Sequence, residues 1–182
     1  MEGEALSRRS LRDRRRDAAY SVMMPRTGPT IYLTRRAEFS ASHFYHSPAL
    51  SPEENRRLFG KCNNPHGHGH NYVLEVTVSG EIDPRSGMVV DLKDLKGVMA
   101  REVLDVLDHR FLNAEVPVFR HVIPTTENLA IEIWRLLDPK MSFCRLHRIR
   151  LYETPDLFVD YFGPEDGTDD QQAAGRQAGA SG

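Results

Sequence analysis

Alternating histidines stand out in residues 61–78, which read KCNNPHGHGHNYVLEVTV. If this segment is a strand, His68 and His70 project from the same face, because side chains alternate along a strand. Two imidazoles cannot fill the tetrahedral shell of a zinc ion, and His43, which ends the upstream segment FSASH, is the natural third ligand. Three imidazole nitrogens with one open position are typical of a catalytic zinc site, although an exposed histidine cluster can also be adventitious.

Two neighbouring side chains leave the ligand set open. His66 shares the parity of His68 and His70 and could compete as a ligand, although the turn residues around it are expected to direct it elsewhere. Cys62 lies beside Lys61 on a loop rich in Gly, Asn and Pro, where a cation and a metal would favour the thiolate and give a base or nucleophile. Cys62 could instead be a fourth ligand that closes the site.

Other candidate groups are weaker when taken alone. Asp108 and His109 form a carboxylate–imidazole pair at the end of a predicted helix, where a histidine often only meets the helix dipole. Glu127 opens the next predicted helix and Glu153 ends a predicted strand, so both also have plain structural explanations. Cys144 is interpreted as a small buried hydrophobic residue.

The elements that must position these groups alternate along residues 31–163. Period-two alternation predicts strands, and apolar residues at three- and four-residue steps predict helices. Ser51 and Gly60 delimit a short helix, and Thr125 or Thr126 caps a later one that Pro139 ends. The pattern predicts an antiparallel α+β sheet with helices on one face. The order is strand 31–43, helix 51–60, strand 70–78, a short apolar run MVVDL at 88–92 counted as a strand, helix 93–107, a helix after Pro124, and strands 146–154 and 157–163.

Composition bounds the classes of function. The 182 residues suit one domain, and the net charge of −2 is unevenly spread. Seven arginines against four acids give residues 1–30 a charge of +3, and four acids with one arginine give residues 164–182 a charge of −3. Both ends are predicted to be disordered tails around a domain at 31–163. The domain has no basic field for nucleic acid and no apolar run of about 18 residues for a membrane. Two cysteines suit a reducing, cytoplasmic setting.

Taken together, the motifs resemble a known family. FSASH, FGKCNNPHGHGHNY, GEIDPRSGMVVDLKDLK, LDHRFLN, PTTENLAIEIW and LYETP occur in the order and at the intervals found in the 6-pyruvoyl-tetrahydropterin synthases. The resemblance covers 31–163 and implies a tunnelling fold, with a four-stranded antiparallel sheet and two helices on one face. It also implies an oligomeric barrel: trimers stacked into a homohexamer, a dimer of trimers, with active sites between subunits.

The resemblance also implies roles for individual residues. Zn²⁺ would be held by three histidines, and a cysteine would accept protons. An aspartate–histidine pair would relay protons, and a glutamate would anchor the pterin beside a Thr–Glu pair. By position these residues are His43, His68 and His70 for zinc, Cys62, Asp108 with His109, Glu153, and Thr126 with Glu127. His66 departs from the family pattern, where an asparagine is expected, and this departure leaves room for a variant metal shell.

The implied activity is a zinc-dependent lyase that converts 7,8-dihydroneopterin triphosphate to 6-pyruvoyl-tetrahydropterin, in tetrahydrobiopterin biosynthesis. No GxGxxG or P-loop motif is present, consistent with an internal rearrangement. The runner-up is a 6-carboxy-tetrahydropterin synthase of the queuosine pathway, but the five residues between Cys62 and His68 favour the pyruvoyl enzyme. The presence of Cys62 argues against membership of the branch of the family that has glutamate at this position. An alternative of another class is a non-catalytic zinc-binding protein in which Cys62 completes the shell.

Overall fold

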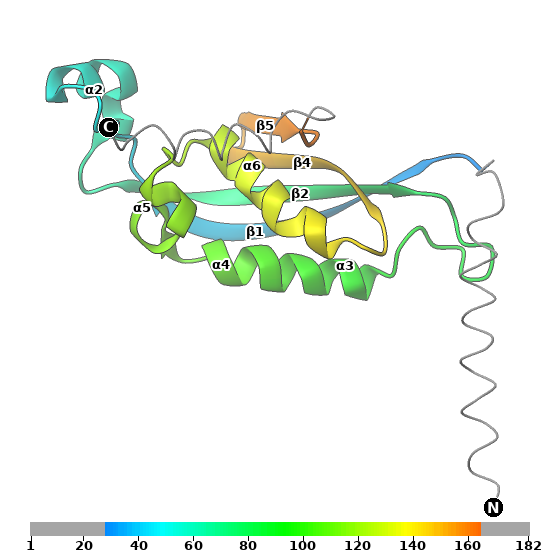
Figure 1. Ribbon diagram of the computed structural model, residues 1–182. Helices are drawn as coiled ribbons and strands as arrows, with labels where there is room; N and C mark the ends of the chain where they lie inside the picture. The colour runs from blue at the N-terminus through cyan, green and yellow to red at the C-terminus, as the bar shows by residue number, and fades with distance from the viewer. Residues whose placement is uncertain (1–27, 165–182) are drawn as a thin grey trace, which may run out of the picture.

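The computed structural model describes residues 28–164, which build a five-stranded sheet with helices along one face (Figure 1). The predicted arm and tail, outside 28–164, lie beyond the described residues. Across the sheet the strand order is β3-β1-β2-β4-β5. Strand β3 runs parallel to β1, and the other neighbours are antiparallel. The bounds are β1 Ile31–His43, β2 His68–Gly80, β3 Arg110–Phe111, β4 Arg145–Thr154 and β5 Leu157–Tyr161.

The long hairpin of β1 and β2 fixes one end of the sheet. Its register runs without a shift from Ile31 opposite Gly80 to His43 opposite His68. Alternate residues of both strands face the core, as the period-two pattern predicts. The hairpin therefore delivers two of the candidate metal ligands as a directly opposed pair at its end.

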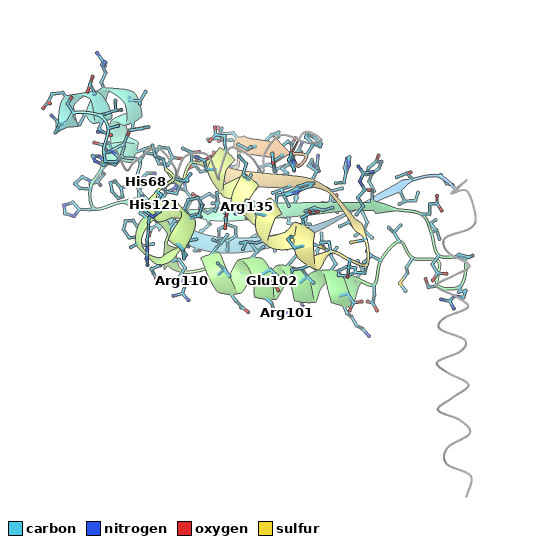
Figure 2. The ribbon with its side chains drawn as sticks, in the orientation of Figure 1. His68, Arg101, Glu102, Arg110, His121 and Arg135 are labelled. Carbon is cyan, nitrogen blue, oxygen red and sulfur yellow. The ribbon has the colours of Figure 1, made fainter. Side chains whose placement is uncertain are left out.

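One face of the sheet carries the core. Tyr72, Leu74, Val76 and Val78 of β2 are fully buried beneath the helices. One helical rod consists of α3 (Leu92–Met99), the π-helical η2 (Ala100–Leu104) and α4 (Asp105–Leu107), and α6 (Thr126–Leu137) lies beside it over β4 and β5 (Figure 1). Exposed arginines such as Arg101 and Arg135 occupy outward positions (Figure 2). No helix in residues 28–164 is long and apolar enough to cross a bilayer.

The helix ends follow the signals in the sequence. Ser51 caps α2 (Pro52–Phe59) in a capping box with Glu54, and Gly60 ends it with a φ of 54°. Thr125 caps α6, and the short η4 (Asp138–Lys140) containing Pro139 follows it. α2 follows β1 and precedes β2 in the chain, and in Figure 1 it stands beyond the end of the sheet. The η1 turn (Gly60–Asn63), which carries Cys62, leads from α2 back toward β2.

The α+β class, the antiparallel main sheet and the two helices on one face are confirmed, but one predicted strand is wrong. Residues 88–91 form no strand, because Asp91 caps α3 by accepting a hydrogen bond from the Lys93 N–H. The fifth strand is instead the two-residue β3, beside β1. The pattern also gave no indication of the short helices α5 (Leu112–Glu115) and η3 (Pro117–Arg120) that follow β3.

Candidate metal centre and active site

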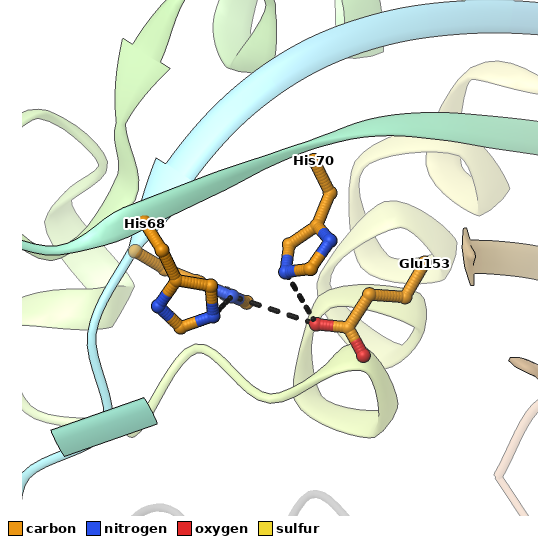
Figure 3. Close-up of side chains that lie close together, drawn as sticks. His68, His70 and Glu153 are labelled. Atoms are coloured by element: carbon orange, nitrogen blue, oxygen red, sulfur yellow. Dashed lines mark hydrogen bonds and ion pairs between the residues drawn. The ribbon is translucent and has the colours of Figure 1, made fainter. Parts of the chain in front are cut away.

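Three imidazoles and one carboxylate converge at the end of the β1–β2 hairpin. His43 Nε2 lies 3.2 Å from His68 Nε2. Glu153 Oε1 lies 3.5 Å from His43 Nε2 and 3.2 Å from His70 Nε2 (Figure 3). One ligand atom from each of these four residues lies within 4.8 Å of the others. In residues 28–164 this is the one group of three or more His, Cys, Asp or Glu side chains so arranged, and it could hold a metal ion.

Strand geometry explains why these histidines meet. His68 and His70 are two residues apart on the core face of β2, and His43 is the last residue of β1, opposite His68. Gly69 lies between His68 and His70. A Cβ at Gly69 would lie 3.1 Å from the carbonyl oxygen of Ala41, so this glycine allows close approach of the neighbouring strand.

The environment of His43 holds it as a neutral ligand. Its side chain is fully buried, and Nδ1 donates a hydrogen bond to the Pro124 carbonyl at 2.8 Å, with Tyr72 Oη 3.2 Å away. Burial lowers the pKa of His43 to about 4, and the Pro124 bond offsets only part of this shift. The Pro124 carbonyl therefore keeps the proton on Nδ1 and leaves the Nε2 lone pair facing the cluster.

One nitrogen that faces the cluster lacks the partner that a metal would supply. It is His70 Nε2, since the 3.2 Å contact with Glu153 lacks hydrogen-bond geometry. Burial lowers the pKa of His68, whose Nε2 faces His43 Nε2 at 3.2 Å. The Glu153 side chain is only 11% exposed, and its recorded ion-pair contacts are with histidines. A cation would stabilise a partly buried carboxylate among imidazoles when burial lowers the pKa of two of them, His43 and His68, and the nitrogen-rich donor set fits zinc.

Glu153 also joins the cluster to the start of α6. The buried Thr126 hydroxyl, in the first residue of α6, donates to Glu153 Oε2 at 3.0 Å. Glu127, the next residue, is exposed. Glu153 therefore presents Oε1 to the imidazoles and holds Oε2 on Thr126, so this carboxylate could join the three histidines in holding a metal ion.

Cys62 lies on η1 beside the cluster rather than in it. The Cys62 carbonyl accepts a 2.8 Å hydrogen bond from the Tyr45 N–H. Burial, and then the Glu153 carboxylate, raise the pKa of the Cys62 thiol, and the exposed Lys61 is not among the causes. The expectation that Lys61 favours the thiolate is therefore not supported within a single chain. His66 is exposed and outside the cluster, with its backbone N–H on Asn64 Oδ1.

The Asp108–His109 pair forms as predicted, on the opposite side of β1. His109 Nδ1 lies 2.9 Å from Asp108 Oδ1, and the Ser40 N–H and His109 hold the pKa of Asp108 down. His109 has a left-handed φ of 59°, and its N–H donates to the Ser40 carbonyl at 2.6 Å. His109 borders a hollow that is also lined by Ser40, Ser42 and His70. The His109 side chain is 83% exposed, and neither it nor Asp108 belongs to the metal cluster of its own chain.

Sequence reasoning missed two tyrosines at the site. Tyr72 continues the alternation of His68 and His70 on the core face, so its contact with His43 could have been found from parity. Tyr45 follows the end of β1, and no periodicity indicates its neighbours. Its ring centroid lies 5.0 Å from that of His43 and 6.0 Å from that of Phe59.

Comparison with known proteins identifies a family with the same α+β fold. Residues 32–164 match the family model for 6-pyruvoyl tetrahydropterin synthase. The human 6-pyruvoyl tetrahydrobiopterin synthase is 50% identical over 131 residues, 72% of this chain and 90% of the human one. The structure of Caenorhabditis elegans 6-pyruvoyl tetrahydropterin synthase superposes with a TM-score of 0.72 at 45% identity, covering 75% of this chain and 98% of that one.

A relative from the runner-up class is more distant. The 6-carboxy-5,6,7,8-tetrahydropterin synthase of Haemophilus influenzae is 31% identical over 121 residues, covering 56% of this chain and 84% of that protein. The chain described here belongs to the 6-pyruvoyl tetrahydropterin synthase family.

Removing a clustered imidazole should abolish metal binding, whereas removing its exposed neighbour should not. We expect His68→Ala to weaken zinc affinity by at least about 100-fold, more than the loss of an outer-shell partner costs. His66→Ala is the matched control and should retain wild-type zinc content. The measurement is metal content by mass spectrometry after dialysis against graded chelator. Equal metal loss in both variants would show that the ligand set is wrong.

Proposed function

We propose that this chain is a zinc-dependent lyase that converts 7,8-dihydroneopterin triphosphate to 6-pyruvoyl-tetrahydropterin and triphosphate. The observation that carries the proposal is the set of three converging imidazoles, with His43 held neutral, beside a thiol loop and a threonine-bound carboxylate. This set occurs in a chain half identical to the human synthase over 90% of that protein. Two free cysteines support a reducing, cytoplasmic location.

The proposed reaction balances without an external oxidant. Loss of the proton and the hydroxyl hydrogen from the first side-chain carbon gives a ketone, and the two electrons reduce the C=N bond of the dihydropterin ring, which takes up protons. Loss of the proton from the second carbon breaks the C–O bond to triphosphate at the third. The resulting enol then becomes a methyl ketone. The protein must therefore move protons at carbon and oxygen and hold the pterin still.

We assign the proposed roles to the following groups. His43, His68 and His70 would hold Zn²⁺, which when bound supplies Lewis acidity toward the side-chain hydroxyls of the substrate. Cys62 removes the carbon-bound protons, and His109, oriented by Asp108, moves protons at oxygen. Glu153, oriented by Thr126, accepts hydrogen bonds from the amino-pyrimidine edge of the pterin, with Glu127 at the rim of the same pocket.

The product identifies the activity. We expect the purified protein to release triphosphate from 7,8-dihydroneopterin triphosphate and to yield a pterin with the mass of the 6-pyruvoyl compound. A chelator should stop the reaction, and added Zn²⁺ should restore it. The measurement is mass spectrometry of the pterin together with a triphosphate assay. A 6-carboxy product would assign the chain to the runner-up activity, and no turnover with zinc bound would reject both.

Substitution of Cys62 distinguishes a zinc enzyme from a non-catalytic zinc protein in which the Cys62 sulfur is the fourth ligand. We expect Cys62→Ala to keep its zinc and to lose about 10²- to 10⁴-fold in turnover, the usual contribution of a positioned base. Cys144→Ala is the control: burial raises the pKa of the Cys144 thiol to about 11, and this residue lies outside the cluster. Zinc loss from Cys62→Ala would instead identify the thiolate as a fourth ligand.

The separate positions of the metal cluster and of the Asp108–His109 pair within one chain support active sites shared between subunits. The metal cluster lies on the core face of β1, whereas His109 is exposed at the edge of the sheet, where its N–H bonds the Ser40 carbonyl. An exposed Asp108–His109 pair outside its own cluster is available to the site of a neighbouring chain. We therefore place the pair at a neighbouring subunit of the family homohexamer, a dimer of trimers, which would also cover the open sheet edges.

Mixed oligomers test this sharing. Cys62→Ala and His109→Ala should each be inactive alone, but co-refolded at equal amounts they should recover up to about a quarter of wild-type activity, the fraction of sites that receive both intact residues. The measurement is turnover of the mixture against each variant refolded alone. If both residues came from the same chain, mixing would restore nothing.

A further inference from the structure

Tyr45 connects the Cys62 loop to the metal cluster. Its N–H donates to the Cys62 carbonyl at 2.8 Å, and its own carbonyl accepts from Asn63 Nδ2 at 2.7 Å. Its ring stands edge-on to His43, and its centroid is 6.5 Å from that of His68. The backbone and ring are therefore fixed relative to both groups, while the side chain stays partly exposed.

The Tyr45 phenol lies among the groups assigned to opposite ends of the substrate. Burial raises its pKa, and the charges of Glu153, Cys62 and Glu127 act on it as well, with a Thr126 hydrogen bond opposing them. A phenol carries one O–H donor, so the hydroxyl beside these groups can donate a hydrogen bond. Thr126 and Glu153 belong to the proposed pterin end, whereas Cys62 belongs to the side-chain end.

Tyr72 provides a contrast within the same site. It is fully buried, and its Oη lies 3.2 Å from His43 Nδ1, so its hydroxyl supports the ligand from behind. Tyr45 instead is partly exposed, and its ring stands at a steep angle to the rings of both His43 and His68. Phenylalanine would keep these ring contacts and lose only the hydroxyl, together with its interaction with Thr126.

We propose that Tyr45 is an additional substrate-positioning residue, whose phenol donates a hydrogen bond to an oxygen of the hydroxylated side chain between the pterin and the metal. This inference rests on the proposed function. A substrate that joins Thr126 and Glu153 at one end to Cys62 at the other must pass alongside this phenol. The donor would favour a hydroxylated side chain over an alkyl one of equal length.

A single-atom change tests the contact. Tyr45→Phe keeps the ring and removes the hydroxyl, and Tyr32→Phe is the matched control, 56% exposed at the far end of β1. The probe is 7,8-dihydroneopterin, which keeps the hydroxyls but lacks the triphosphate leaving group. We expect Tyr45→Phe to bind it about five- to tenfold more weakly by calorimetry, as for one lost hydrogen bond, with unchanged zinc content and melting temperature. Tyr32→Phe should bind as wild type.

The outcomes separate this inference from the proposed function. Wild-type affinity in Tyr45→Phe, or equal weakening in both variants, would overturn the role of the phenol while wild-type turnover still supports the lyase. The same weakening for 7,8-dihydro-6-propylpterin, which lacks the hydroxyls, would also overturn it, since the lost contact would then not be to a side-chain oxygen. Absence of both turnover and binding in the wild-type holoenzyme would instead reject the proposed function and this inference with it.

Discussion

The register between β1 and β2 is the constraint on which the site depends. His43 stands opposite His68 and Ala41 opposite His70, so all three imidazoles reach the same end of the core face. Because side chains alternate along a strand, a slip of one residue would send one strand's imidazoles to the other face. Tyr72, Leu74, Val76 and Val78 on the same parity oppose such a slip, since it would expose four fully buried side chains. The apolar pattern that builds the core thus also assembles the metal ligands.

Glu153 shows how one residue can meet two demands. Its Oε1 completes the cluster, and its Oε2 is held by Thr126 at the start of α6. Without a cation this carboxylate is a partly buried negative charge facing three imidazoles, and burial lowers the pKa of two of them, His43 and His68. A bound cation would compensate that charge. Under the proposed function the same side chain would also anchor the pterin, and the Thr126 hydroxyl would orient it for both roles.

Short-range signals accounted for much of the fold. The β1 bounds, the Ser51 cap and the apolar stripe of α6 follow from alternation, capping chemistry and helical spacing. The run at 88–92 failed because the cap at Asp91 belongs to the following helix and outweighs local β-propensity. Strand β3 escaped prediction because two residues carry no periodicity. For the site, parity placed His68 and His70, but the meeting of Glu153 with them depends on the pairing of β4 with β2, a long-range contact that one sequence does not display.

Ser40 links the Asp108–His109 pair to the strand that carries His43. Its backbone N–H bonds Asp108 Oδ1 at 2.8 Å and its carbonyl accepts from the His109 N–H at 2.6 Å, three residues before His43. The strand that buries His43 in the core thus also holds His109, whose φ is left-handed, at its edge. Because these bonds are to the backbone of Ser40, the Asp108–His109 pair lies beside β1 at the edge of the sheet, apart from the four clustered side chains. The proposed sharing of sites between subunits rests on this separation.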